Sequence, residues 1–158
     1  LDGWTGLTGV NAHTATDGSP TIAEATGDIY EAASAHVTAF GRKPTLLVMH
    51  PRRSAWFRSN PSLDPRFETY FKAGVADSRS ITIANGSGSN EDQVYLVNVE
   101  EMPLFLAAGG PKLGVYPQIQ SSTLQVKIVV SLTCAFPAER QPKAVSVSSG
   151  TQWVLPVF

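Results

Sequence analysis

Basic and aromatic side chains alternate in one short segment of this sequence. Arg52, Arg53 and Arg58 surround the neighbouring Trp56 and Phe57. Such a pattern can bind single-stranded nucleic acid, because bases stack on aromatic rings while cations attract phosphates. It can equally form an interface between subunits, since Arg and Trp are enriched at the centres of such contacts. A third interpretation is a helix with a buried aromatic side and a solvated Arg side.

The interface interpretation assigns Arg52, Arg53, Trp56 and Arg58 to a contact between subunits. A rival interpretation places His50, Arg52 and Arg53 around an anionic ligand, as in a small anion-binding domain or enzyme. That alternative requires a concave pocket in which the three side chains converge. His50 lies where a strand is expected to pass into a helix, and capping that helix is its expected role.

No coherent catalytic set accompanies these residues. The sequence has neither a Gly-x-Ser-x-Gly nucleophile motif nor a Gly-x-x-x-x-Gly-Lys-Ser/Thr phosphate loop. Cys134 is the only cysteine, which excludes an internal disulfide and a cysteine-based metal site. The spacing of His13, His36 and His50 matches no compact metal motif. We therefore expect no enzyme activity, no cofactor, no metal and no small-molecule substrate.

Composition favours a globular protein with little bulk attraction to polyanions. The chain has 158 residues, of which 42% are hydrophobic and 16% charged, and its formal net charge is −1. A charged share below the usual value of about 25% suits a subunit with large protein contacts. The near-zero net charge gives no general attraction to nucleic acid or to anionic membranes. No apolar run is long enough to span a membrane, so no membrane partner is expected.

The clearest local prediction is a helix over residues 22–40. Thr21 and Glu24 have the spacing of a capping box, and Gly41 suits the helix end because glycine tolerates positive φ. Residues 45–49 form a continuous apolar strand, which indicates burial on both faces. Pro51 then fits the first turn of a second helix, over residues 51–59.

The rest of the chain reads mainly as strands. A helical stripe is predicted over residues 66–75, and the regular alternation of residues 123–134 predicts a long strand with one buried face. Together these elements predict an α+β fold, with a central mixed or antiparallel sheet flanked by helices, in a single domain over residues 1–158. Shorter strands are expected at 81–84, 94–99, 104–106 and 144–147.

The strand-to-helix segment resembles part of a known family. Residues 43–57, and within them Met49-His50-Pro51-Arg52-Arg53-Ser54-Ala55-Trp56, are similar to a strand and helix in the A domain of tailed-phage major capsid proteins of the Hong Kong 97 fold. Residues 123–136 resemble the long late strand of that family. Residues 142–150 resemble its closing strand, and residues 1–10 its Gly-rich entry into the A domain.

The resemblance carries expectations for the domain organisation. Residues 1–158 are expected to form an A-domain-like domain, with residues 123–150 contributing strands to the family's P domain. The N-terminal arm, extended loop and spine helix of the family have no counterpart here, so the chain is expected to be the C-terminal part of a longer protein.

The resemblance also carries expectations for function. It implies a structural subunit of an icosahedral capsid, made in the bacterial host cytoplasm and located in the virion. Its partners would be other copies of the same protein and packaged DNA on the inner surface of the shell. Loops near residues 60–66 and 85–93 are expected to meet neighbouring subunits. An encapsulin-type nanocompartment shell has the same architecture and is the alternative.

Overall fold

A computed structural model describes residues 7–86, 88–120, 123–135 and 140–154, with the side chains of 116–127 outside the description. The described chain divides into two compact units. The larger unit draws on residues 1–102 and 138–158, and the smaller unit on residues 103–137. Each unit is described by itself.

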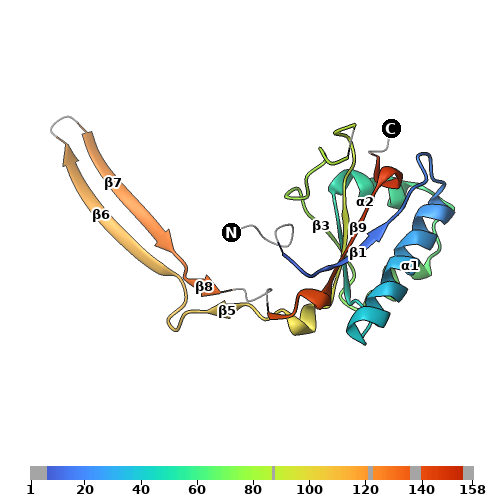
Figure 1. The fold of residues 1–158 in the computed structure, drawn as a ribbon. Coiled ribbons are helices and arrows are strands. Elements are labelled where there is room, and N and C mark those ends of the chain that lie inside the picture. The colour runs from blue at the N-terminus through green and yellow to red at the C-terminus, as the bar shows by residue number, and fades with distance from the viewer. Residues whose placement is uncertain (1–6, 87, 121–122, 136–139, 155–158) are drawn as a thin grey trace. The chain divides into compact units, whose positions relative to one another are not determined.

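The larger unit is built on a five-stranded mixed sheet in the order β1-β9-β4-β2-β3 (Figure 1). The two edge pairs, β1 with β9 and β2 with β3, run parallel, whereas the inner pairs are antiparallel. This arrangement confirms the predicted α+β class with a mixed sheet. The strands are β1 (Asn11–Thr14), β2 (Leu46–Met49), β3 (Val75–Asp77), β4 (Val94–Val97) and β9 (Val145–Ser149).

Helix α1 (Ile22–Phe40) has the ends that the sequence predicts. Thr21 Oγ1 accepts a hydrogen bond from the Glu24 amide at 3.3 Å, and the Glu24 carboxylate accepts one from the Thr21 amide at 2.8 Å. Gly41 ends the helix with φ of 84°, and its amide donates to the Val37 carbonyl at 2.7 Å. Both ends therefore have partners for backbone groups that a helix leaves unpaired.

The predicted strand-to-helix junction is confirmed. Strand β2 ends at Met49, and α2 (Pro51–Ser59) begins with Pro51 in its first turn. His50 is the N-cap, and its Nδ1 accepts a hydrogen bond from the Arg52 amide at 3.2 Å. Alternate residues of β2 face opposite sides of the sheet, so Leu47 and Met49 join one apolar cluster and Val48 joins the other. Both faces are buried, as the unbroken apolar run indicates.

Residues 66–84 depart from the sequence prediction. Helix α3 (Arg66–Tyr70) ends early, because the chain turns at Gly74, with φ of 82°, and continues as the edge strand β3. Residues 81–84 form bends instead of the predicted strand, although Ile81 is buried in the core. The apolar residues at 67, 70, 71 and 75 have the spacing of a helix. In the structure, however, the left-handed turn at Gly74 directs Val75 into the sheet.

The smaller unit consists of two short antiparallel pairs. Strand β6 (Lys112–Gln120) pairs with β7 (Thr123–Ser131), and β5 (Phe105–Leu106) pairs with β8 (Cys134–Ala135). The strand expected over residues 123–134 is thus interrupted between β7 and β8. Residues 123–150 are shared between the units, because β9 belongs to the five-stranded sheet. The predicted buried face is absent from the described part of β7, where Ile128 and Val130 are 64% and 66% exposed.

Gly150 follows β9 at a point where a side chain has no room. Its φ is 118°, and a Cβ there would approach the Ala15 carbonyl oxygen to 2.3 Å. We expect Gly150→Ala to lower the free energy of unfolding by about 2 kcal/mol or more, since a strained backbone and a backbone clash combine. Gly18→Ala, where nothing lies within 4 Å, should change it by no more than about 0.5 kcal/mol. Equal urea midpoints for the two variants would contradict this account.

Candidate functional site

The predicted Arg–Trp segment contains one arginine that lies in the protein interior. Arg53 is 1% exposed and faces Asp92, which is fully buried. Its Nη2 donates to Asp92 Oδ1 at 2.9 Å and its Nε to Oδ2 at 3.3 Å, so the pair is bidentate. Nη2 also donates to the Val154 carbonyl at 2.7 Å. These contacts give the guanidinium a charge partner and a further acceptor away from water.

Two tryptophans flank the buried guanidinium. The Arg53 Cζ atom lies 5.4 Å from the ring centre of Trp56 and 5.3 Å from that of Trp153. Both distances suit cation–π attraction, which is strongest where water is excluded. Trp153 is fully buried, and its indole N–H donates to Ser148 Oγ at 2.9 Å. The buried pair therefore joins α2 to the segment before β4 and to the C-terminal turn η5 (Thr151–Trp153).

Burial and charge act in opposite directions on Asp92. Burial raises the pKa of the Asp92 carboxyl above its ordinary value, while the Arg53 charge and hydrogen bond lower it in part. The Asp92 amide also donates to the Trp153 carbonyl at 2.9 Å. Asp92 consequently holds the C-terminal turn directly through its backbone amide, and indirectly through Arg53, which its side chain binds and which donates to the Val154 carbonyl.

The other predicted interface residues lie in different surroundings. Arg58 is half exposed and pairs with Glu68 at 3.0 Å and with Asp77 at 3.5 Å. Arg52 is exposed, and Trp56 is partly buried against the core. Because Arg53 is enclosed by its own subunit, it cannot contact a neighbouring subunit. A subunit contact through Arg52, Trp56 and Arg58 stays a prediction.

The rival anion site needs cations that are available to a ligand. Arg53 is already bound to the Asp92 carboxylate and to a main-chain carbonyl. His50 directs Nδ1 at the backbone amide of Arg52 to cap α2. The geometry therefore gives these residues structural roles and offers no converging set for an anion.

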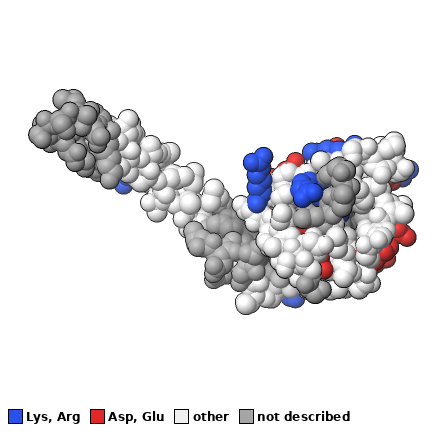
Figure 2. Space-filling model, turned by 90° about the horizontal axis from the view of Figure 1, so that it is seen from above, with Lys and Arg blue, Asp and Glu red and all other residues white. Residues whose placement is uncertain are grey.

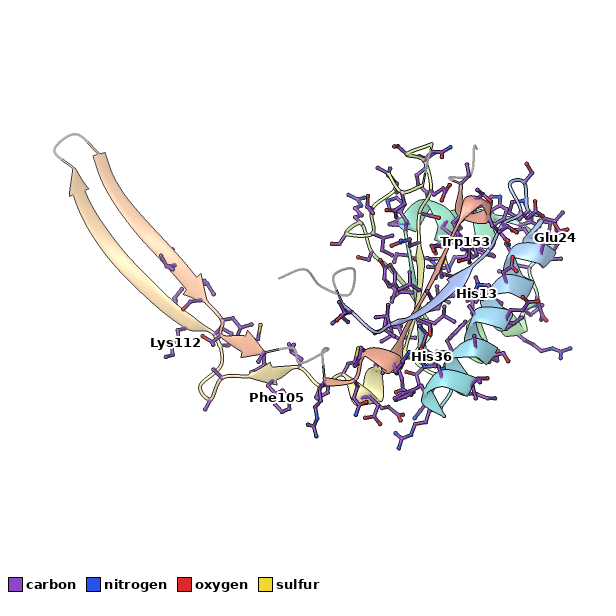
Figure 3. The ribbon with its side chains drawn as sticks, in the orientation of Figure 1. His13, Glu24, His36, Phe105, Lys112 and Trp153 are labelled. Carbon is purple, nitrogen blue, oxygen red and sulfur yellow. The ribbon has the colours of Figure 1, made fainter. Side chains whose placement is uncertain are left out.

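His36 on α1 and His13 on β1 each lie beside a serine of β9 (Figure 3). His36 is fully buried; its Nδ1 is 2.8 Å from Ser146 Oγ, and its Nε2 has no hydrogen-bond partner among the described residues. Burial lowers the pKa of the His36 imidazole below the ordinary value of 6.5. His13 lies 3.3 Å from Ser148 Oγ through Nδ1 and 4.0 Å from Glu31 through Nε2.

The described residues lack two further kinds of feature. They contain no group of three or more His, Cys, Asp or Glu side chains placed to hold a metal ion. No helix in that part of the chain is both long and apolar enough to cross a membrane.

Comparisons with known proteins leave the assignment to chemistry and geometry. No protein-family model matches the chain. No curated protein matches its sequence either.

Sequence reasoning found Arg53 and Trp56 but missed their buried partners. Asp92 and Trp153 lie 39 and 100 residues from Arg53 along the chain. No spacing rule links such distant positions. The one available signal is that a charged residue inside an aromatic helix needs a buried partner of opposite charge.

We expect Arg53→Met to lower the free energy of unfolding by about 3–5 kcal/mol, because it leaves the Asp92 carboxylate buried without a cation. Arg58→Met, which breaks an exposed pair, is the matched control and should cost no more than about 1 kcal/mol. Adding Asp92→Leu to Arg53→Met should recover most of the loss. Urea unfolding of the four proteins measures these effects, and similar losses in the two arginine variants would refute them.

We expect stability to fall as the pH drops below about 6.5, since unfolded His36 takes up a proton that the buried side chain resists. Above that pH, His36 makes its full contribution to the free energy of unfolding. The contribution is lost as the pH falls toward the lowered pKa of His36 in the folded state. The slope from His36 is at most about 1.4 kcal/mol per pH unit. His36→Gln keeps a polar group beside Ser146 and should flatten the profile between about pH 7 and pH 5.5. Parallel profiles for the two proteins would show that His36 is not the group responsible.

Proposed function

We propose that this chain is a structural subunit of an icosahedral phage capsid of the Hong Kong 97 fold, located in the virion. It associates with copies of itself to enclose the genome and catalyses no reaction. One observation carries the proposal: the smaller unit exposes a large share of apolar side chains, and a protein partner would cover them.

The exposed residues are concentrated in that unit. Leu113 is 67% exposed and Val115 is 56% exposed on β6, and their cross-strand partners Val130 and Ile128 are exposed to a similar degree. An isolated two-stranded ribbon is marginally stable in water, and contiguous exposed apolar surface marks interaction sites. Further exposed apolar residues in the unit are Leu104, Phe105, Leu106, Val129 and Leu132.

The larger unit supports the proposal in a different way, because it is well packed and has a defined shape. Its sheet is buried on both faces, and the Arg53–Asp92 pair ties its C-terminal turn to α2. Repeating shells need such subunits, because small errors in shape accumulate around a closed ring. The segments that resemble the capsid family support the same proposal. Residues 43–57 form β2 and α2, and residues 142–150 contain β9.

The competing proposals have less support. An anion-binding enzyme would need Arg53, which is engaged within the subunit. An encapsulin-type shell uses the same architecture and differs in its contents. With a formal net charge of −1, the chain attracts DNA only through local patches, so weak contact with a packaged genome is expected.

We expect the protein, expressed alone, to form capsomer rings or shells that electron microscopy can image. Ile128→Asp combined with Val130→Asp should prevent assembly while leaving the melting temperature of the larger unit unchanged, because those side chains are exposed in the free subunit. Val99→Asp, an exposed change in the larger unit, is the control and should assemble.

Soluble monomer under every condition tried for the unaltered protein would count against the proposal. Shells purified from infected cells that hold an enzyme in place of DNA would favour the nanocompartment alternative.

A further inference from the structure

A concave acidic surface lies between α1 and the chain that leaves β1. We call it the acidic cleft; it is lined by Asp17, Glu24, Asp28 and Glu31, together with His13 and Gln152, and by no Lys or Arg. Glu24, Asp28 and Glu31 follow one another at helical spacing, so they share one side of α1. Figure 3 places Glu24 near the start of the helix and His13 toward the strand. Figure 2 shows acidic side chains along the side of the larger unit where α1 lies in Figure 1.

The cleft also contains a buried donor without a partner. Gln152 is 2% exposed, and its Nε2 has no hydrogen-bond acceptor among the described residues. An amide N–H needs a hydrogen-bond acceptor such as a carbonyl oxygen, whereas the surrounding carboxylates attract a cation. A peptide segment carrying Arg or Lys supplies both groups. A free metal ion supplies neither an acceptor nor, for these widely spaced carboxylates, a suitable ligand set.

The charges of this chain are segregated along its length. Residues 1–41 contain Asp2, Asp17, Glu24, Asp28 and Glu31 but no Lys or Arg. Residues 42–80 contain eight Lys or Arg against three acidic residues, Asp64, Glu68 and Asp77. The two segments therefore carry formal net charges of −5 and +5. Arg42, Arg53 and Lys72 are paired with carboxylates from outside the basic segment, so its other cations are the ones available to meet the acidic segment of a second copy.

Within the basic segment, Arg79 differs from the arginines that are held in place. Arg42, Arg53 and Arg58 pair with carboxylates of their own subunit. Arg79 is exposed and forms no ion pair with any residue that the structure describes. It lies in the turn after β3, where the Ser78 amide donates to the Met49 carbonyl at 3.0 Å and anchors the start of the turn.

The acidic cleft and Arg79 lie at opposite edges of the five-stranded sheet. The cleft adjoins β1, which is one edge strand, and Arg79 follows β3, which is the other. Complementary groups on opposite edges produce head-to-tail contacts, and such contacts close into rings when the rotation permits.

We propose that the acidic cleft receives the Arg79 turn of a second copy of this chain. The guanidinium lies against Asp28 and Glu31. The Gln152 side chain turns outward on docking, and its Nε2 then donates to a main-chain carbonyl of the turn. This inference rests on the proposed function and names the contact by which neighbouring subunits meet in a ring. Because the charges are exposed, the contact weakens as salt concentration rises.

Charge reversal tests the contact, with sedimentation velocity and electron microscopy as readouts. Arg79→Glu should weaken self-association about tenfold at low salt, and Asp28→Lys with Glu31→Lys should do the same. In a mixture of those two proteins both contacts between unlike copies pair opposite charges, so association should be restored. The triple variant should likewise associate nearly as well as the unaltered protein. Arg66→Glu is the matched control, because Arg66 is 90% exposed in the same basic segment, and it should leave association unchanged. Association of Arg79→Glu equal to that of the control would overturn the proposal.

Disulfide trapping separates this inference from the proposed function. In a Cys134→Ser background, Arg79→Cys and Glu31→Cys proteins should form a crosslinked dimer when mixed, even where no shell forms. Shells that assemble without this crosslink would refute the docking and leave the capsid proposal intact. A crosslinked dimer from a protein that never forms rings would support the docking and refute the capsid. Neither crosslink nor association would overturn both.

Discussion

A charged pair buried away from water stabilises a fold only when every one of its polar atoms has a partner. In this protein Arg53 Nε and Nη2 donate to both oxygens of Asp92, Nη2 also donates to the Val154 carbonyl, and two tryptophans flank the guanidinium. The partners come from α2, from the segment before β4 and from the C-terminal turn. This one interaction therefore fixes the path of the chain end, which passes so close to Ala15 that only glycine fits at position 150.

The two units differ in how far they bury their own side chains. The larger unit buries its aromatic residues, its ion pair and His36 within itself, and it leaves opposite charges at the two edges of its sheet. The smaller unit has too few strands to bury its own apolar residues and presents them to the surroundings. In the assembly proposed above, the apolar ribbon contributes affinity without direction, and the charged edges set the orientation of neighbouring copies.

Local signals in the sequence predicted local structure well. The capping box at Thr21 and Glu24, Gly41, and Pro51 fix the ends of α1 and α2 because each acts on neighbouring backbone groups. Two tertiary features could not be read in this way. Gly74 converts the expected end of a helix into an edge strand, and β7 alternates as a half-buried strand although its described side chains are exposed. Alternating apolar residues predict that one face of a strand is shielded from water, but not whether the same chain or a neighbouring molecule shields it.

For the candidate site, residue type identified Arg53 but distance along the chain concealed Asp92 and Trp153. The charge segregation between residues 1–41 and 42–80 was visible in the sequence, yet only the sheet order places those segments at opposite edges. That same order has a consequence for synthesis on the ribosome. Strand β9 follows β4 along the chain but lies between β1 and β4 in the sheet, so β1 has no neighbouring strand until β9 has emerged. The two parallel edge pairs therefore form at different stages of synthesis, β2 with β3 first and β1 with β9 later.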